Sequence, residues 1–543
     1  DLSVTKSSNI DSDYKPILTY NFDDSNVLNN PEIYEIEIEL INDQVGPHKL
    51  FNDVDKLERI IKKNITHVLS GLQGTNYPIS YPEQRDIQED YLKLIGRDIS
   101  KLVGKNGKLK IRTSDFCGPS SYTLQMKNIQ PSSENNNTPN IRNYYTVTDK
   151  ADGERKLMYI SKSGKIYLIT TNMEIEFTGI KAKDREQYNS LLDGEFAILL
   201  MDFNKDLIVM ATDIFKTKPL FYSNDNGSFG CSTYRTALDK VKHTNVKKAK
   251  PNTAMMFKIS DGSLIDEFTI YEFDLNQHKD NFDDWNEAFS KSILKRTSDT
   301  SQEIFIGLSS GYDSGAICCE LLKYNIPFKA YSVLGACDPR IIHENNAIID
   351  LRHSMISQSE TAEVETLWKK TELYNAHRDL VQRGTEEFIY TIESSSSNYK
   401  ERRKLIDDRA SSWLSLVCTH AINDGRKLYL SGLGADEIFS DYGFGGIKKT
   451  QHSNFGGLFP KDLSTIFPWN SFYFSSMESY LAKEEYVSGM HGVETRYPFL
   501  DKKVVQEFLW LDHNLKNSQY KSVLDNYFVE NNYPFNRGEK KGF

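Results

Sequence analysis

The stretch EIFIGLSSGYDSGAICCELL, residues 303–322, decides the fold that we expect for most of this chain. The apolar run Ile304–Leu308 predicts a short buried strand, and the run from Ala316 to Leu322 predicts a helix. The turn between them is rich in Ser and Gly. Glycine lets a ligand approach the backbone closely, and free amides at a helix start suit a phosphate group. The stretch therefore predicts a phosphate-binding turn, with an ordinary loop as the alternative.

Two further blocks repeat this kind of arrangement. LYLSGLGADEIF, residues 428–439, again reads as an apolar strand, a glycine turn with carboxylates and a helix. GMHGVETRYPFLD follows at residues 489–501. The first turn contains the carboxylate of Asp313, which fits an anion site only when a cation bridges it to the ligand, so it indicates Mg²⁺ bound with a nucleoside triphosphate.

The three blocks, in this order, resemble the synthetase domain of the asparagine synthetase family, whose blocks read approximately SGGLDS, SGEGSDE and GLEVRVPFLD. The resemblance covers residues 190–543 and implies a PP-loop ATP-binding domain at 276–543. It implies an ATP-dependent amide ligase with ATP and Mg²⁺ as cofactors. A small carboxylate, aspartate in the family, is activated as an acyl-adenylate with release of pyrophosphate and is then amidated by ammonia.

The resemblance also implies roles for individual residues. The implied pyrophosphate cradle consists of Ser309, Ser310, Gly311, Asp313 and Ser314. The adenine pocket would be lined by the strand 328–333, which ends at Val333, and by Ser431 and Gly432. The Mg²⁺ ligands would be Asp313 and Asp436. The catalytic residues would be Lys521, Asp436 and Glu437. Arg537 and Lys540 resemble a basic tail that folds over the site, with a solvated basic face as the alternative.

One position departs from the family pattern in a way that bears on the chemistry. Leu433 stands where the family motif has a glutamate that is credited with assisting amide formation. A leucine side chain cannot move protons. Another group substitutes for it, the substrate differs, or the reaction stops at the adenylate. Residues 337–427 predict helices and a loop, without chemistry that the sequence assigns.

The N-terminal part of the chain has a different character. KADGER at residues 150–155 matches the KxDG motif of capping enzymes and DNA ligases, in which the lysine, here Lys150, carries a nucleotide as a phosphoramidate. YEIEIEL at 34–40, FCGPSSYTL at 116–124 and a predicted hairpin at 156–170 extend the match. Residues 30–195 thus resemble the mRNA capping enzymes of large DNA viruses, cut at both ends. A turn Asp-Gly at a hairpin and a half-exposed strand are the plain alternatives.

The two resemblances meet at LLDGEF, residues 191–196, a phrase similar to blocks of both families. Residues 190–275 resemble the back half of a glutamine amidotransferase domain without its N-terminal cysteine nucleophile, so glutaminase activity is not expected. We expect four regions: a triphosphatase-tail-like region with a linker (1–130), a partial nucleotidyltransferase (131–189), the partial amidotransferase (190–275) and the synthetase domain (276–543). Such a chain is a fusion, natural or constructed.

The fold class that follows is α/β: a C-terminal doubly wound parallel sheet with extra helices, preceded by a partial amidotransferase β-sandwich and a β-rich α+β N-terminal region. Two helices are expected in the N-terminal region, one at 54–71 and one within 81–102, and the first 30 residues are expected to fray.

Composition restricts location and partners. The formal charge is −10, so no global basic field favours a membrane surface or nucleic acid; a nucleic-acid partner is expected only if the capping-like region works. The 6 cysteines lack CxxC spacing, which is typical of reduced thiols in the cytoplasm, here the host cytoplasm or virion if the protein is viral. The expected partners are a small carboxylate and ammonia, with a homodimer left open. The chain opens at Asp1 rather than Met, which favours a fragment or a processed product.

Overall fold

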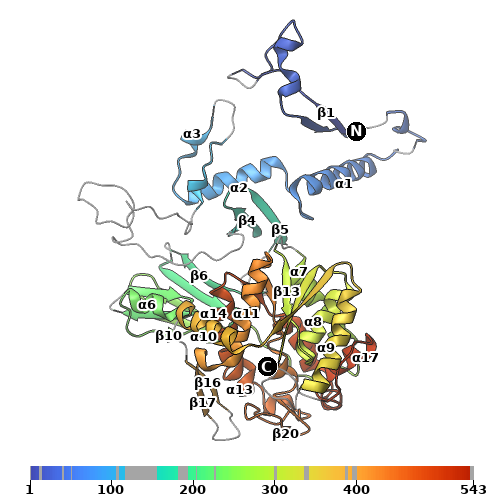
Figure 1. Ribbon diagram of the computed structural model, residues 1–543. Helices are drawn as coiled ribbons and strands as arrows, with labels where there is room; N and C mark the ends of the chain where they lie inside the picture. The colour runs from blue at the N-terminus through green and yellow to red at the C-terminus, as the bar shows by residue number, and fades with distance from the viewer. Residues whose placement is uncertain are drawn as a thin grey trace. The chain divides into compact units, whose positions relative to one another are not determined.

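The computed structural model describes residues 2–11, 15–39, 42–49, 52–104, 109–116, 156–181, 194–202, 205–225, 228–298, 302–335, 342–385, 389–393 and 400–538. The chain divides into two compact units, one of residues 1–122 with 153–187 and one of residues 123–152 with 188–543 (Figure 1). The finer division into four regions stays a prediction. Among the helices within these ranges, none is long and apolar enough to cross a membrane.

The larger unit is built on a five-stranded parallel sheet. Its strands, in spatial order, are β15 (Ala362–Trp368), β14 (Phe328–Leu334), β13 (Ile304–Gly307), β18 (Leu428–Leu430) and β21 (Glu494–Arg496). All four neighbouring pairs are parallel, which confirms the expected sheet. Along the chain, β14 and β15 follow on one side of β13, and β18 and β21 then follow on its other side. The chain order therefore reverses between β13 and β18.

Both faces of this sheet are buried, as the continuous apolar strands predict. Ile304 and Ile306 pack in one core with α7 (Asp283–Thr297), α8 (Tyr312–Lys323) and α17 (Ser522–Glu530). Phe305, between them in sequence, points into a second core with α11 (Arg409–Asn423). Figure 1 shows α8 and α9 on one side of the sheet and α11 on the other. The arrangement is that of a doubly wound sheet.

Further helices surround the sheet: α9 (Ile342–Ser357), α10 (Thr371–Gly384), α12 (Ala435–Phe439), α13 (Asn470–Tyr473), α14 (Ser476–Gly489), α15 (Lys502–Trp510) and α16 (His513–Lys516). Two antiparallel pairs are also present, β16 (Ile389–Glu393) with β17 (Lys400–Lys404) and β19 (Gly443–Phe444) with β20 (Ile447–Lys448). The helices expected between residues 337 and 427 are thereby confirmed.

Two small antiparallel sheets precede the parallel sheet in the same unit. One has the order β12 (Leu264–Thr269), β11 (Thr253–Lys258), β7 (Leu207–Thr212), β6 (Ala197–Asp202); the other has β10 (Lys247–Lys248), β8 (Phe221–Asp225), β9 (Ser228–Ser232), followed by α6 (Arg235–Lys240). The ring of Phe257 lies 5.4 Å from that of Tyr222 and 4.9 Å from that of Phe229, so the two sheets share a core. Antiparallel sheets at 190–275 are confirmed; their amidotransferase origin stays a prediction.

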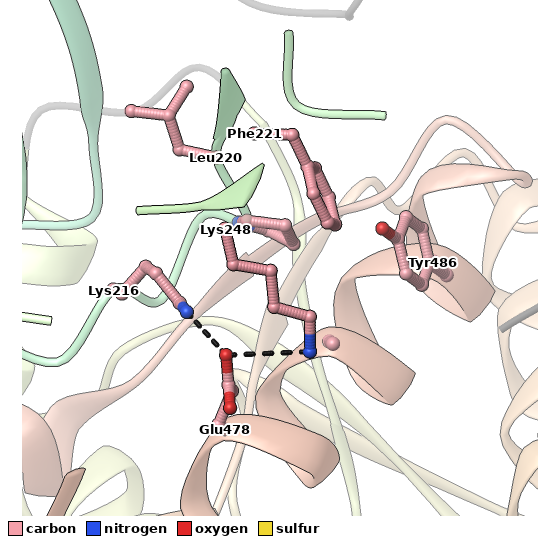
Figure 2. A pocket seen from close by; sticks show the side chains of 8 residues that line it. Lys216, Leu220, Phe221, Lys248, Glu478 and Tyr486 are labelled. Atoms are coloured by element: carbon pink, nitrogen blue, oxygen red, sulfur yellow. Dashed lines mark hydrogen bonds and ion pairs between the residues drawn. The ribbon is translucent and has the colours of Figure 1, made fainter. Parts of the chain in front are cut away.

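Ion pairs join these sheets to the helices around the parallel sheet. Lys216 and Lys248 both reach Oε1 of Glu478 on α14, at 2.5 and 3.6 Å (Figure 2). Lys216 is buried, and burial lowers the pKa of its ammonium against the opposing pull of Glu478. The cavity beside the pair measures only about 10 Å³ and takes no more than one water. We therefore assign this cluster a structural role.

The smaller unit contains α1 (Val54–Gln73), α2 (Tyr81–Leu94), α3 (Ile99–Leu102) and an antiparallel sheet of β3 (Lys156–Ile160), β4 (Lys165–Thr170) and β5 (Ile175–Lys181). The predicted hairpin and both predicted helices are confirmed. Tyr91 and Leu92 on α2 pack with Tyr167 and Ile169 on β4, which gives this unit its own core.

Two expectations for the first 40 residues are wrong. The strand expected at 34–40 is only β2 (Ile33–Ile36), which pairs with β1 (Leu2–Thr5), a segment that was expected to fray. Glu37 and Glu39 lie beyond the strand, so Glu35 is the one glutamate of the stretch 34–40 that the strand contains. The reason is the partner: β1 is four residues long and pairs with four residues of β2, and alternation alone cannot extend a strand past its partner.

Candidate active site

A cavity of about 1,230 Å³ opens where β13 and β18 end. This is the carboxyl edge of the sheet at the point where strand order reverses, the place where open α/β sheets bind ligands. Apart from Arg537 of the expected basic tail, its lining includes the predicted site residues that the structure describes: Ser309, Ser310, Gly311, Asp313, Ser314, Val333, Ser431, Gly432, Asp436, Glu437 and Lys521. Lys150 and Lys540 lie outside the described residues. The fold therefore assembles one site from the first two sequence blocks, from β14 and from the segment that carries Lys521, whereas the third block, residues 489–501, contributes no residue to the lining.

The first turn holds its own shape. Ser314, in the first turn of α8, accepts a hydrogen bond at Oγ from the amide of Ser309 (3.1 Å), and the two hydroxyl oxygens lie 3.0 Å apart. The Ser309 hydroxyl in turn accepts from the amide of Gly311 (3.1 Å). The turn is thus closed before any ligand binds, and the start of α8 faces the cavity, where amides and the helix dipole favour an anion.

Arg352 on α9 holds the turn through two of its carbonyls, a contact that was not predicted from the sequence. Its Nη1 donates to the carbonyls of Ser309 (2.5 Å) and Gly311 (2.9 Å), and its Nε donates to the carbonyl of Pro534 (3.1 Å). The side chain is fully buried, and burial lowers its pKa. A Cβ on Gly315 would lie 2.5 Å from Nη2 of this guanidinium, so glycine is required there by space rather than by backbone conformation. No motif marks this arginine in the sequence, because α9 mixes apolar and polar residues along its whole length.

Two carboxylates from different strand ends converge on one buried lysine. Lys521 forms ion pairs with Asp313 and, at 2.9 Å, with Oδ1 of Asp436, which also accepts from the hydroxyl of Tyr520 (3.1 Å). Burial by itself lowers the pKa of Lys521, but the two carboxylates outweigh it and the pKa is raised, so the lysine is a fixed cation. A Cβ on Gly432 would lie 2.8 Å from that of Asp313, which shows how closely the two turns approach.

These carboxylates fit a divalent cation in part. Mg²⁺ prefers carboxylate and phosphate oxygens and keeps several waters, so one or two carboxylates together with a triphosphate can hold it. Asp313 and Asp436 supply such oxygens. No group of three or more His, Cys, Asp or Glu side chains able to hold a metal occurs within the described ranges. The donors present therefore fit a cation that arrives with a nucleotide rather than one held by protein alone.

Glu437 lines the cavity but its oxygens already have partners. Its carboxylate accepts from the amide of Gly434 (3.2 Å) and from the hydroxyl of Tyr442, and its carbonyl accepts from Nε1 of Trp469 (2.8 Å). Gly434 has φ 99° and a Cβ there would lie 2.4 Å from Leu500, so this turn depends on glycine. These contacts hold the second turn in place at the start of α12.

The rest of the lining comes from segments to which the sequence analysis gave no chemistry. Basic and aromatic side chains there include Lys369, Arg403, Arg409, Lys483, Trp413 and Tyr480. Lys483 forms an ion pair with Asp408 (3.3 Å). Glu484, next to Lys483 on α14, also lines the cavity. Their positions could not be read from the sequence because no motif marks them.

The C-terminal segment lies against the first turn as far as Gly538. The amide of Gly538 donates to the hydroxyl of Tyr312 (2.9 Å), and Nη2 of Arg537 pairs with Oδ2 of Asp525 (2.6 Å). Arg537 is not part of the cavity lining. Its described role is to hold the segment on α17; a direct role toward a ligand stays a prediction.

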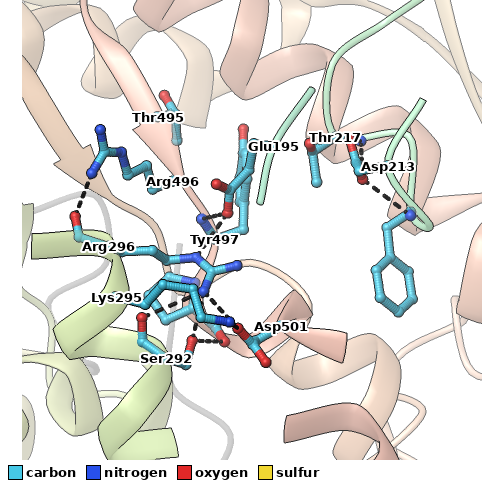
Figure 3. A network of polar contacts seen from close by, with 12 residues as sticks. Glu195, Asp213, Thr217, Ser292, Lys295, Arg296, Thr495, Arg496, Tyr497 and Asp501 are labelled. Carbon is cyan, nitrogen blue, oxygen red and sulfur yellow. Dashed lines mark hydrogen bonds and ion pairs between the residues drawn. The ribbon is translucent and has the colours of Figure 1, made fainter. Parts of the chain in front are cut away.

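Glu195, from the LLDGEF junction, is part of a buried polar network (Figure 3). Its Oε1 accepts from Nε of Arg296 (2.8 Å) and from the amide of Tyr497 (2.9 Å). Nη1 of Arg296 also donates to Oδ2 of Asp501 (2.9 Å), which pairs with Lys295 (2.7 Å). The glutamate of the phrase shared by both families thus connects the start of β6 to the third block, GMHGVETRYPFLD.

Comparison with known proteins finds two separate resemblances, one in the C-terminal part of the chain and one to a capping enzyme. Residues 284–465 match the family model described as asparagine synthase, so the chain contains an asparagine synthase domain. It is 25% identical over 356 residues to a putative glutamine-hydrolyzing asparagine synthetase of Methanocaldococcus jannaschii, which covers 60% of this chain and 58% of that protein. It is 31% identical over 166 residues to a probable mRNA-capping enzyme of Acanthamoeba polyphaga mimivirus, which covers 31% of this chain and 11% of that protein. Both resemblances are confirmed.

Solved structures add little. An NMN synthetase from Francisella tularensis aligns with 49% of this chain and 100% of its own at 11% identity, with a TM-score of 0.21. A glutamine phosphoribosylpyrophosphate amidotransferase from B. subtilis aligns with 22% of this chain and 29% of its own at 14% identity, with a TM-score of 0.15. Neither likeness is close enough to bear on fold or function.

Proposed function

We propose that this chain is an ATP-dependent amide ligase of the asparagine synthetase type, which activates a small carboxylate and then amidates it. The observation that carries the proposal is the convergence of Asp313, Asp436 and Lys521 in a cavity that the turn 309–314 and the start of α8 also line. A triphosphate with its cation fits this combination of anion-binding turn and paired carboxylates.

The residues divide the work of the first step. The turn 309–314 and the start of α8 bind the β- and γ-phosphates, and Arg352 keeps its carbonyls turned away from the anion. A substrate carboxylate oxygen attacks the α-phosphorus, the bond to the bridging oxygen breaks, and pyrophosphate leaves. Lys521 neutralises charge on the departing group because it is buried and remains protonated. A bound Mg²⁺ would polarise the phosphates beside Asp313 and Asp436.

In the second step ammonia attacks the acyl carbon, the bond to the AMP oxygen breaks, and the nitrogen loses a proton. The proposed partners are therefore a small carboxylate and ammonia, and aspartate is the first candidate because of the asparagine synthase domain. Glutamine hydrolysis is not part of the proposal.

The test uses purified protein with ATP, Mg²⁺, aspartate and ammonium, and measures AMP and pyrophosphate. AMP that depends on a carboxylate and is lost in Asp313→Ala would support the proposal. Glu530→Gln, an exposed carboxylate outside the cavity lining, is the matched control and should keep full activity. No AMP with any small carboxylate would refute it.

A second function has one observation in its favour, the 31% identity to the mimivirus capping enzyme. It is a guanylyltransferase in which Lys150 takes up GMP from GTP with loss of pyrophosphate. Incubation with α-labelled GTP and Mg²⁺ would leave label on the wild type and none on Lys150→Met. Absence of label on the wild type would favour a third possibility, in which this part of the chain is a non-catalytic module that docks onto a partner.

A further inference from the structure

The position that should supply a carboxylate for amide formation is occupied by a leucine. Leu433 lines the cavity and packs against the main core, so its side chain is part of the wall. The backbone nevertheless keeps the turn in place, because the amide of Leu433 donates to the hydroxyl of Ser431 (3.1 Å). The backbone at Leu433 is therefore held in the turn, but its side chain cannot act as an acid or a base.

A carboxylate reaches the same turn from another element. Glu484, on α14, lines the cavity and accepts a hydrogen bond at Oε2 from the hydroxyl of Ser431 (2.5 Å). That hydroxyl is the one that accepts from the amide of Leu433. The hydroxyl oxygen of Ser431 therefore links the carboxylate of Glu484 to the amide of Leu433, the position at which the family has its glutamate.

The partners of Glu484 differ from those of a structural carboxylate. Its neighbour Glu485 is bound by both oxygens to Nζ of Lys218, at 2.7 and 2.8 Å, and by the hydroxyl of Tyr497 at 2.9 Å. Glu484 makes no ion pair with any residue that the structure describes. Buried carboxylates that serve stability are normally paired with a cation.

The surroundings place Glu484 in the range where it can exchange a proton. Burial raises its pKa to about 7, with the Ser431 hydroxyl and the charge of Lys483 pulling the other way and the charges of Glu485 and Glu437 adding to the rise. The buried hydroxyl of Tyr429 and thiol of Cys418 lie within its field. A carboxyl group with a pKa near the working pH is suited to general base catalysis.

We propose that Glu484 is the general base of the amide-forming step and takes the place of the side chain missing at Leu433. This rests on the proposed function. As the nitrogen of ammonia forms its bond to the acyl carbon and the bond to the AMP oxygen breaks, the carboxylate of Glu484 accepts the proton that the nitrogen loses. The proton then passes to solvent through the open cavity.

The test separates the two halves of the reaction. Exchange of labelled pyrophosphate into ATP, driven by aspartate or another small carboxylate, reports adenylate formation alone; amide product in ammonium reports the whole reaction. Glu484→Gln should keep the exchange and lose amide formation by about 100-fold or more, since it keeps the shape and removes the base. Equal loss in both assays, or no loss of amide formation, would overturn the assignment. Absence of exchange in the wild type with every carboxylate tried would instead refute the proposed function.

Two further variants exclude a structural explanation. Leu433→Glu in the Glu484→Gln background restores a carboxylate at the same turn and should recover amide formation; failure to recover it counts against the proposal. Glu485→Gln removes the neighbouring carboxylate on α14 and should keep the amide formation that Glu484→Gln loses, with its pH dependence moved to lower pH because the charge of Glu485 raises the pKa of Glu484. The ratio of wild-type to Glu484→Gln amide rates should fall as the pH drops below about 7, because the wild-type base becomes protonated.

Discussion

Replacing Arg296 by methionine tests whether the buried network of Figure 3 holds the antiparallel sheets to the third sequence block. Arg296 is 4% exposed, and its guanidinium bonds to Glu195, Asp501 and the hydroxyl of Ser292 at 2.8, 2.9 and 2.9 Å. Methionine keeps much of the side-chain volume and removes the charge. Two buried carboxylates then lose their shared cation.

The expected loss in unfolding free energy depends on the hydrogen bonds and ion pairs that Glu195 and Asp501 keep in Arg296→Met. Removing one partner of a buried ion pair costs about 3–5 kcal/mol because the other charge stays buried. Asp501 keeps Lys295 (2.7 Å) and the amide of Lys503 (2.9 Å), and Glu195 keeps the amide of Tyr497 (2.9 Å). These partners place the loss at the lower end, about 3 kcal/mol.

Lys295→Met is the matched control, since it removes one positive charge from the same helix and the same carboxylate. The Lys295 side chain is 43% exposed, so its loss should cost only about 0–1 kcal/mol. Urea unfolding followed by tryptophan fluorescence, to which the buried Trp285 on the same helix contributes, gives both values. If Arg296→Met costs no more than Lys295→Met, the network does not hold the two parts together and the reasoning is wrong.

The same network predicts an acid-dependent loss of stability. Burial raises the pKa of Asp501, but the charges of Arg296 and Lys295 outweigh it, so the folded-state pKa lies below the ordinary value of about 4. As the pH falls, Asp501 is therefore protonated in the unfolded chain before it is protonated in the folded protein. The stabilisation from its ion pairs is full above about pH 4 and is lost as the pH falls from there through the pKa of Asp501 in the folded state. The difference in unfolding free energy between wild type and Arg296→Met should be full at pH 7 and shrink below about pH 4; a constant difference would contradict this.

Two more predictions concern the cavity. Gly315→Ala brings a methyl group to 2.5 Å from Nη2 of Arg352, so this guanidinium must move and its bonds to the carbonyls of Ser309 and Gly311 are disturbed. Carboxylate-driven pyrophosphate exchange should then fall by about tenfold or more, while Gly425→Ala, at a surface turn with open space, affects stability alone. Lys521→Met leaves Asp313 and Asp436 facing each other without their cation; exchange should fall by about 100-fold or more, and unchanged exchange would remove Lys521 from the mechanism.

Local sequence was sufficient for local structure. The strand, turn and helix of residues 303–322 and the hairpin at 156–170 follow from apolar periodicity and turn residues, and the structure has them where the sequence predicts. The expectation failed at 34–40, because the length of a strand depends on its partner, and β1 offers only four residues. Motif order also predicted that Asp313, Asp436 and Lys521 belong to one site.

Tertiary structure decided which other side chains complete that site and which carboxylates are available for chemistry. Arg352 meets the first turn across 41 residues, and Glu484 meets Ser431 across 53, distances at which no periodicity links one residue to another. Glu195 belongs to the motif LLDGEF, which is similar to blocks of two families, and only its buried ion pair with Arg296 shows that its role is structural. The sequence alone thus determined the elements and the kind of site, whereas the packing of α9 and α14 against the sheet edge decided its charges, because burial and contact set the charge state of an ionisable group.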